Sequence, residues 1–418
     1  MVLSLSIPAE RGEKPASRDL NYSWSEAAGD RVGIRETIAV AIIESVGGHG
    51  GMDHYDLGLA RGLAAAGCRV SLYTGEQITN PASPCIAIYP EFKGVYGRSN
   101  RWLRAFRFLR GSVSALARAT IHREKICHLH LFHGETQELA LVILSKLCRR
   151  KVVITVHDVE SFAPVTTSRS LIGRVYGLAD RLIVHNQISK RELVEKLKIS
   201  PTKISVIAAG NYMMDLGEAP SQAYARRSLG ISEESRVILF FGQIKDVKGL
   251  DILIEAIPAV AREVPEVTLI IAGRPWKSGF APYETLIDAL GIRSRCVLHI
   301  RYIPNDEIAR YFASADVVVL PYRRIYQSGV VLMAMSYGRP AVVSDLPGMT
   351  EMITDGENGY VFAQGSKDAL AEKLIRVLRD GQGREETARR ALEYIRRHHD
   401  WDKIGKATSE LYSSILRG

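Results

Sequence analysis

Two lysines on a glycine-bounded loop are the residues of this chain best suited to bind a phosphate. Lys245 and Lys248 lie between Gly242 and Gly249. A lysine ammonium is a compact charge that binds phosphate oxygens well. The apolar stretch 236–241 just before this loop predicts a buried strand, and a helix is expected to follow the loop. The spacing therefore predicts an anion-binding loop at the carboxyl end of a strand.

A serine-glycine pair predicts a second anion-binding feature. Ser328 is a natural N-cap for the helix predicted from Gly329 to Gly338. The free N–H groups and the dipole of such a helix start suit a diphosphate, and glycine lets a ligand approach the backbone closely. The same strand, loop and helix also occur in many α/β proteins as plain structure, so this stretch alone favours neither interpretation.

A histidine-aspartate pair follows the β-branched stretch 151–156 directly. His157 and Asp158 are expected at the edge of a parallel sheet where catalytic groups are presented. These side chains suit general acid-base chemistry, with Asp158 as a base. The alternative, of equal weight, is that the two residues only shape the site.

A glycine-rich turn follows the first predicted strand, 37–43. Its residues Gly48, His49, Gly50 and Gly51 do not match the dinucleotide pattern Gly-x-Gly-x-x-Gly. The turn predicts close backbone approach to a phosphate or sugar, and the structural alternative is a tight turn.

Three further histidines raise the question of a metal. His128, His130 and His133 lack carboxylates at ligand spacing, and the chain has no Asp-x-Asp motif. Hydrogen-bonded histidines, and no metal site, are therefore expected.

A basic, aromatic stretch lies between Lys93 and Lys125. Arginines recur at every third position, at 98, 101, 104, 107 and 110, with Trp102, Phe106 and other apolar residues between them. On a helix this pattern is typical of a membrane-surface segment facing anionic lipid. An ordinary surface helix with snorkelling arginines is the main alternative. Nucleic acid is not expected, because no recognition motif accompanies the stretch.

The composition describes a globular chain with an anionic partner. The 418 residues exceed one ordinary core, and 55 Lys and Arg against 46 Asp and Glu give a net charge of +9. Neither a secretory signal nor a membrane-spanning run is seen, and the five cysteines form no Cys-x-x-Cys pair. A cytoplasmic location is expected, with peripheral attachment to the inner face of the plasma membrane as the membrane-bound alternative.

Alternating strands and helices in both halves predict the fold class. We expect an α/β protein with two doubly wound, Rossmann-like domains facing across a cleft. The predicted segments are a flexible extension at 1–36, an N-terminal domain at 37–212, a C-terminal domain at 213–398 and a crossover helix at 399–418.

The order of these motifs resembles the retaining glycosyltransferases of family four, or glycosyl transferases group 1, which have the GT-B fold. No single motif is specific, but their order and spacing from about Ile38 onward are. The matching stretches are the turn at 47–51, His157-Asp158, 242–256, 271–273, 315–322, 338–340, Glu351 and 355–359.

The resemblance implies sugar transfer from a nucleotide donor held by the C-terminal domain, with the last helix crossing back to the N-terminal domain. It implies that Lys248 binds the diphosphate, that Arg274 lies near the base and that His157 lies near the sugar. The catalytic candidates are His157, Asp158 and Lys248. The donor-binding candidates are Gly242, Gln243, Lys245, Lys248, Gly273, Arg274, Gln327, Ser328, Gly329 and Val330, and the acceptor-binding candidates are Gly48, His49, Gly50 and Gly51.

The chain departs from the family at the donor site. Two glutamates commonly stand where this chain has Ile325 and Met333, and a common arginine is replaced by Gln243, for which Lys245 supplies a charge. With its Gln-Ser-Gly, the chain is similar to an atypical branch that lacks the two glutamates.

The expected function is retaining transfer of a sugar from a UDP- or GDP-linked donor to a lipid-linked saccharide in cell-surface polysaccharide synthesis. No cofactor is expected, and the expected partners are the donor, this acceptor and an anionic membrane. The alternatives are a sugar-nucleotide epimerase, a phosphorylase, or an inactive nucleotide-sugar-binding subunit on the same fold.

Overall fold

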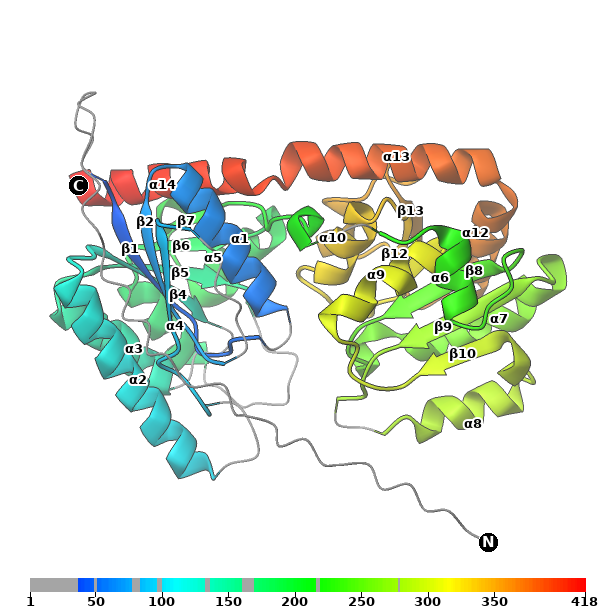
Figure 1. Ribbon diagram of the computed structural model, residues 1–418, viewed down its shortest axis with the longest axis horizontal. Helices are drawn as coiled ribbons and strands as arrows, with labels where there is room; N and C mark the ends of the chain where they lie inside the picture. Colours follow the sequence, from blue (N-terminus) through cyan, green and yellow to red (C-terminus); the bar gives the residue numbers. More distant parts are fainter. Residues whose placement is uncertain are drawn as a thin grey trace, which may run out of the picture. The chain divides into compact units, whose positions relative to one another are not determined.

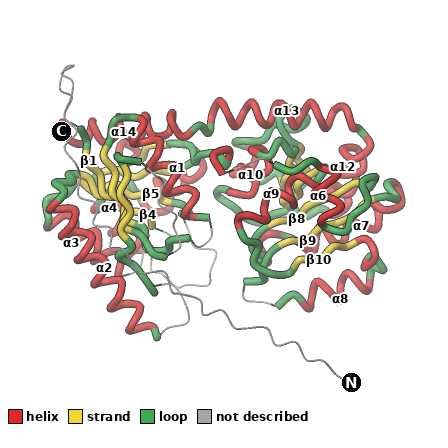
Figure 2. Tube along the Cα trace, in the orientation of Figure 1, coloured by secondary structure: helices red, strands yellow, loops and turns green. Residues whose placement is uncertain are grey.

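Two parallel β-sheets organise the computed structural model, which describes residues 37–48, 51–76, 83–95, 100–131, 136–159, 169–215, 219–276 and 279–418. Within these residues the first sheet has seven strands in the order β3-β2-β1-β4-β5-β6-β7, and the second has six in the order β10-β9-β8-β11-β12-β13. Figure 1 and Figure 2 show helices packed around each sheet. The predicted α/β class with two doubly wound sheets is confirmed.

The first half contains β1 to β7 and the helices between them. The strands are β1 (Ala39–Ile43), β2 (Arg69–Tyr73), β3 (Ile86–Tyr89), β4 (Ile126–Leu131), β5 (Lys151–Val156), β6 (Arg181–Val184) and β7 (Ile204–Val206). The helices are α1 (Met52–Ala65), α2 (Arg101–Ile121), α3 (Thr136–Leu147), α4 (Arg169–Leu178) and α5 (Gln187–Leu197), with a 3-10 turn η1 (Pro201–Lys203).

The second half repeats this alternation. The strands are β8 (Arg236–Phe241), β9 (Val267–Ala272), β10 (Cys296–His299), β11 (Val317–Leu320), β12 (Ala341–Ser344) and β13 (Tyr360–Phe362). The helices are α6 (Gln222–Ser228), α7 (Leu250–Glu263), α8 (Ala281–Ala289), α9 (Asn305–Ser314), α10 (Gly329–Ser336), α11 (Pro347–Thr350), α12 (Lys367–Arg379), α13 (Gly381–His398) and α14 (Trp401–Arg417). The 3-10 turns are η2 (Met213–Asp215), η3 (Asp246–Lys248) and η4 (Arg293–Arg295).

The strand order determines where a ligand binds. All five residues of β1 are buried, as an apolar strand covered on both faces requires. β1 lies between β2 and β4, and β8 lies between β9 and β11, so the direction of the chain path reverses beside each of these strands. Doubly wound sheets bind ligands at the carboxyl ends of the strands at such a switch point. The loops after β1, β8 and β11 are therefore the expected places.

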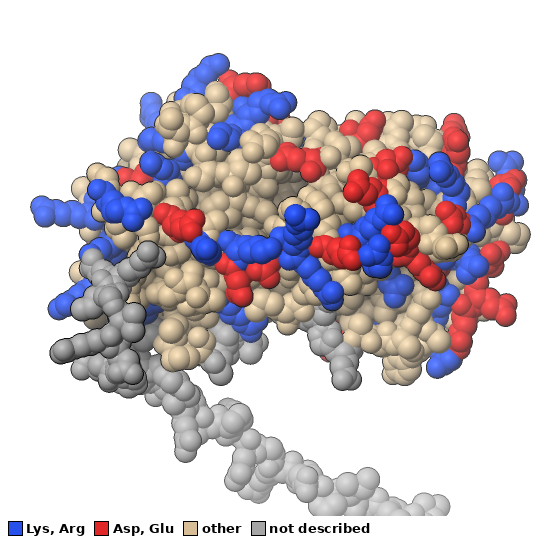
Figure 3. All heavy atoms as spheres, turned by 90° about the horizontal axis from the view of Figure 1, so that it is seen from above, with Lys and Arg blue, Asp and Glu red and all other residues tan. Residues whose placement is uncertain are grey.

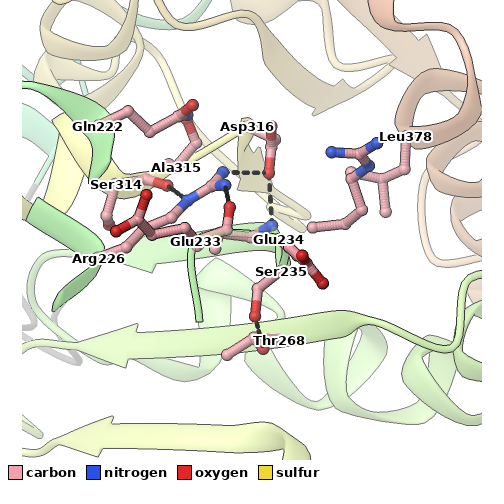
Figure 4. Close-up of polar contacts among 12 residues, drawn as sticks. Gln222, Arg226, Glu233, Glu234, Ser235, Thr268, Ser314, Ala315, Asp316 and Leu378 are labelled. Carbon is pink, nitrogen blue, oxygen red and sulfur yellow. Dashed lines mark hydrogen bonds and ion pairs between the residues drawn. The ribbon is translucent and has the colours of Figure 1, made fainter. Parts of the chain in front are cut away.

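A buried ion-pair cluster connects the amino-terminal ends of strands in the second sheet, opposite the carboxyl ends where the ligand is expected (Figure 4). The carboxylate of Asp316, just before β11, accepts hydrogen bonds from Arg226 Nη2 of α6 at 2.8 Å and from the main-chain N–H of Val237 in β8 at 2.6 Å. Arg384 of α13 lies 3.4 Å from the same carboxylate. One buried acid thus connects α6, α13 and two strands.

The C-terminal helix returns to the first half, as predicted. In Figure 1, α14 lies along α1, and the two helices are in contact. They approach closely because glycines face each other: a Cβ atom on Gly405 would lie 2.0 Å from the carbonyl carbon of Gly62.

The face of the molecule seen in Figure 3 shows acidic and basic side chains intermingled, without one continuous basic patch. Charged side chains of α13 pair along the helix, as Arg389 does with Glu386 and Glu393.

Some expected features differ or were not predicted. The basic helix begins only at Arg101, because the Asn100 side chain caps it by accepting from Trp102 N at 3.0 Å, and residues 91–95 form turns. β3, α4, α6 and α8 were not predicted from the sequence. The predicted extension at 1–36 and Arg98 lie outside the described residues. The predicted domain boundaries stay predictions. No helix in the described ranges is both long and apolar enough to span a membrane.

Candidate functional site

The loop after β8 brings Lys248 to the switch point of the second sheet. Gly242, at φ 98°, turns the chain out of the strand, and η3 returns it toward the sheet. A Cβ atom on Gly242 would lie 3.2 Å from Lys248 Nζ and 3.4 Å from a methyl group of Val330. The ammonium and the first turn of α10 thus meet beside Gly242. Burial lowers the pKa of Lys248 to about 8, so its charge is held where solvent does not stabilise it well.

Helix α10 begins as the sequence predicts. The Ser328 side chain is buried and accepts from Val331 N at 3.4 Å, which makes Ser328 the N-cap. The helix therefore begins at Gly329, and its positive end lies beside Gly242, as the Lys248 ammonium does. It ends before Gly338, whose φ of 61° gives the predicted left-handed stop.

The other donor-side candidates surround this point. Gly273 packs against the carbonyl of Gly242, where a Cβ atom would lie only 1.9 Å from the oxygen. Ile244 N donates to the carbonyl of Arg274 at 3.0 Å, which fixes the main chain of residues 273–274 beside the loop, and the Arg274 side chain is exposed. Lys245 Nζ lies 4.6 Å from the ring centre of Trp276. Gln243 and Gln327 are half-buried.

The end of β5 presents His157 and Asp158. The His157 ring packs edge-on against Tyr55, with ring centres 4.9 Å apart, and near His130 and His185. Burial, and then the neighbouring histidines, hold the pKa of His157 well below its ordinary value, so the imidazole is neutral near pH 7. It is thus suited to hydrogen bonding with a sugar hydroxyl rather than to charge stabilisation.

Asp158 connects the two halves electrostatically. Burial raises its pKa to about 6, against the opposing effect of the Lys245 and Arg324 charges. Both of these cations come from the donor-side loops of the second half. The structure therefore brings Asp158 near Lys245, one of the two predicted donor-binding lysines.

Hydrogen bonds to Glu44, a residue that sequence analysis did not single out, fix the main chain at the start of the glycine-rich turn. Glu44, fully buried at the end of β1, accepts from Val46 N at 2.5 Å and from Gly47 N at 2.7 Å. Gly48 N donates to the carbonyl of Glu76 at 3.0 Å. Gly51, at φ 83°, begins α1. His49 and Gly50 lie outside the described residues.

A buried acid pair stands behind this turn. Asp56 Oδ1 of α1 lies 2.7 Å from His130 Nδ1, and its carboxyl is close enough to Glu44 to affect the pKa of that residue. Burial raises the pKa of both carboxyls well above their ordinary values, and for Glu44 the charge of Asp56 adds to the rise. No spacing rule predicts this pair, because Glu44 and Asp56 belong to different elements.

The remaining histidines have structural partners. His128 Nδ1 lies 2.6 Å from the Tyr412 hydroxyl of α14, and its Nε2 lies 2.7 Å from Thr155 Oγ1. His133 lies outside the described residues. Among the described residues, no group of three or more His, Cys, Asp or Glu side chains is arranged to hold a metal ion.

At the two positions where the resembling family commonly has glutamate, this chain has apolar residues that also pack against apolar neighbours. Ile325 and Met333 are partly buried against the hydrophobic core of the second sheet. Neither provides a carboxylate for a donor sugar or ribose.

Comparison with known proteins identifies the family. The model for Glycosyltransferase Family 4 matches residues 49–210, and the model for Glycosyl transferases group 1 matches residues 221–398. The chain belongs to the family-four glycosyltransferases. It is therefore an enzyme of a retaining, nucleotide-sugar-dependent family. That the chain is in an atypical branch of this family stays a prediction.

Relatives of this glycosyltransferase cover nearly its whole length. A D-inositol 3-phosphate glycosyltransferase from Nocardioides sp. is 26% identical in an alignment 404 positions long, which covers 88% of this chain and 85% of the relative. Sucrose-phosphate synthase from Thermosynechococcus elongatus has a similar structure, with a TM-score of 0.74 at 20% identity over 91% of this chain and 99% of that one. Anabaena HepE in complex with UDP-glucose has a TM-score of 0.70 at 20% identity, over 90% and 100%. These structures establish the GT-B fold.

Proposed function

We propose that this glycosyltransferase transfers a sugar from a UDP- or GDP-linked donor to a lipid-linked saccharide acceptor, with retention of configuration. The observation that supports the donor site is the meeting of three features beside Gly242: the Lys248 ammonium, the start of α10 and the main chain of Gly273. Each suits a diphosphate, and together they form a pre-arranged positive site. The UDP and UDP-glucose complexes of HepE are consistent with a UDP-linked donor.

The proposed roles of the site residues follow from the charges that develop when the donor bond breaks. The bond between the anomeric carbon and the β-phosphate oxygen breaks, leaving negative charge on the phosphate and positive charge on the sugar. Lys248, Lys245 and the α10 start stabilise the phosphate. The acceptor oxygen bonds the anomeric carbon from the same face, and its proton passes to the departing phosphate. Asp158, with its raised pKa, is the alternative base, and neutral His157 hydrogen-bonds to the sugar.

The outer face of α2 supports a membrane-bound acceptor. Trp102, Phe106, Leu109 and Val113 are 72%, 64%, 51% and 55% exposed and, at spacings of four, three and four, lie on one face of the helix. The opposite face, with Phe108, Gly111 and Ala115, is buried. An exposed aromatic stripe of this kind suits the interface of an anionic membrane.

The arginines of α2 have two different tasks. Arg104 Nε donates to the Val95 carbonyl and Arg107 Nη1 to the Gly94 carbonyl, each at 2.9 Å, so these two hold the preceding turn. Arg101 and Arg110 are exposed beside the apolar stripe and are the candidates for binding lipid phosphate.

The related D-inositol 3-phosphate glycosyltransferases point to a second acceptor class, a soluble phosphorylated polyol.

The experiment for the donor site is a thermal shift of the purified protein with UDP-, GDP- and ADP-sugars. Binding to the native state at a hundredfold excess over Kd stabilises it by about 2.7 kcal/mol. We expect a clear shift with one nucleotide and loss of that shift in Lys248→Ala. Lys406→Ala, an exposed lysine on α14, is the matched control and should shift like the wild type. No shift with any donor, in a folded sample, would contradict the proposal.

A further inference from the structure

The segment after β7 passes between the two halves and is held rigidly at Asn211. The Asn211 carbonyl oxygen lies 2.8 Å from His54 Nε2 of α1 and accepts from Trp401 Nε1 of α14 at 2.9 Å. The Asn211 N–H donates to the His399 carbonyl at 2.8 Å. The backbone that leads into the next residue, Tyr212, is therefore fixed by α1, by α14 and by the connection between α13 and α14.

Tyr212 itself is held from both halves. Its ring stacks flat on His54 of α1, with ring centres 3.8 Å apart and planes 4° from parallel. Its N–H donates to Ser336 Oγ of α10 at 3.1 Å. The stacked ring and the fixed backbone leave the phenol little rotamer freedom, so the place of its hydroxyl is well determined.

That hydroxyl lies at the beginning of two helices. The oxygen is 2.8 Å from where a Cβ atom on Gly329 would lie, and 3.6 Å from the corresponding position on Gly51. Gly329 is the first residue of α10 and Gly51 precedes α1, so one glycine from each predicted ligand-binding stretch lies beside the same phenol. The α10 end also lies near Lys248, as the shared contact of Lys248 and Val330 with Gly242 shows.

We propose that the Tyr212 hydroxyl is a further donor-binding group, which donates a hydrogen bond to a β-phosphate oxygen of the nucleotide sugar. The inference rests on the proposed donor site. A phenol hydroxyl beside the first residue of α10 can donate to an anionic oxygen bound there, and such charge-assisted hydrogen bonds are short and strong. Tyr212 thereby completes a cradle whose other members are Lys248 and the free N–H groups at the start of α10.

The test is the variant Tyr212→Phe, which removes the hydroxyl and keeps the stacked ring. The probes are whichever of UDP, GDP and ADP stabilises the wild type most, and its nucleoside monophosphate. We expect the variant to bind the diphosphate about ten- to hundredfold more weakly, to bind the monophosphate as the wild type does, and to lose a similar factor in kcat/KM. Tyr224→Phe, on α6 with the ring 60% exposed, is the matched control and should change neither.

The outcomes separate this inference from the proposed function. If the wild type binds no nucleoside diphosphate, the donor site itself is wrong. If the wild type binds and Tyr212→Phe binds and turns over equally well, only the role of Tyr212 is wrong. A variant that weakens monophosphate and diphosphate equally would show a structural role and would also overturn the inference.

A second variant tests the geometry without any ligand. A Cβ atom on Gly329 would lie 2.8 Å from the Tyr212 oxygen but 3.8 Å from the nearest ring carbon. Gly329→Ala should therefore lower the melting temperature, and adding Tyr212→Phe should restore it. Equal melting temperatures for Gly329→Ala with and without the hydroxyl would show that the phenol does not lie against α10.

Discussion

Two side chains at the site have pKa values on either side of neutral pH. Burial lowers that of Lys248 to about 8 and raises that of Asp158 to about 6. Both shifts weaken the charged form, which these residues need if the lysine is to bind phosphate and the aspartate is to accept a proton. Between these values both groups are ionised in the free enzyme.

The pH dependence of kcat/KM should therefore be bell-shaped. Activity falls below about pH 6, as Asp158 gains a proton, and above about pH 8, as Lys248 loses one. Asp158→Asn should remove the acidic limb at a lower plateau. Lys248→Arg keeps a charge at every accessible pH and should remove the alkaline limb. An unchanged alkaline limb in Lys248→Arg would show that another group controls it.

Sequence reasoning proposes those candidate site residues whose placement depends on close neighbours in the chain. Ser328 before Gly329, the lysine loop and the His157-Asp158 pair follow from local turn and cap rules. Glu44, Asp56 and Tyr212 were not found, because their roles arise from contacts between elements far apart in the sequence. Glu44 is the one with a usable pattern: an acid at the end of an apolar strand, directly before a glycine-rich turn.

At the scale of elements, the stability of the second sheet depends on Asp316, the buried acid just before β11. Asp316 accepts from Arg226 and from Val237 N, and lies near Arg384. Replacing it with Asn keeps the shape and leaves two cations without their counter-charge.

The variant Asp316→Asn should lower the free energy of unfolding by about 3–5 kcal/mol, the range found when one partner of a buried ion pair is removed. Chemical denaturation followed by circular dichroism would measure it. The matched control is Glu393→Gln, which removes an exposed pair with Arg389 and should cost less than about 1 kcal/mol. Equal effects of the two variants would mean that the cluster contributes no more than a surface pair.

The helix α2 makes a second prediction at this scale. Trp102→Ser with Phe106→Ser removes the exposed aromatic stripe without touching the buried face, so the melting temperature should stay unchanged. Sedimentation with vesicles containing anionic lipid should show at least a tenfold loss of binding, and Arg101→Glu with Arg110→Glu should act in the same direction. Ile121→Ser, 76% exposed at the other end of the helix, is the control. Full binding by the double serine variant would remove the membrane from the proposal.

At the scale of the whole molecule, strand order and the C-terminal crossover place the site. The βα rhythm predicted two doubly wound sheets, since each apolar strand must be covered on both faces. The unpredicted elements, such as β3 and α8, are short or lack strong periodicity. The return of the last helix to the first half was expected only through family resemblance, and its contact with α1 was not predicted, because no local rule states which helix the last one packs on.

The contact between α14 and α1 depends on glycines that leave room for close approach. It can be tested by comparing alanine substitutions at a glycine inside the contact and at a glycine with open space around it. Gly405 of α14 faces Gly62 of α1, where a Cβ atom would lie 2.0 Å from backbone carbon, whereas a Cβ atom on Gly177 of α4 would meet nothing within 4 Å. Alanine is the better helix former by about 1 kcal/mol, so Gly177→Ala should stabilise the protein slightly. Gly405→Ala should instead destabilise it by about 1–3 kcal/mol, because forcing a methyl into close-packed backbone moves α14 off α1. Thermal unfolding of both variants measures the difference. Stabilisation by both would mean that α14 is free to shift, and that the Trp401 bond to Asn211 does not fix the segment that carries Tyr212.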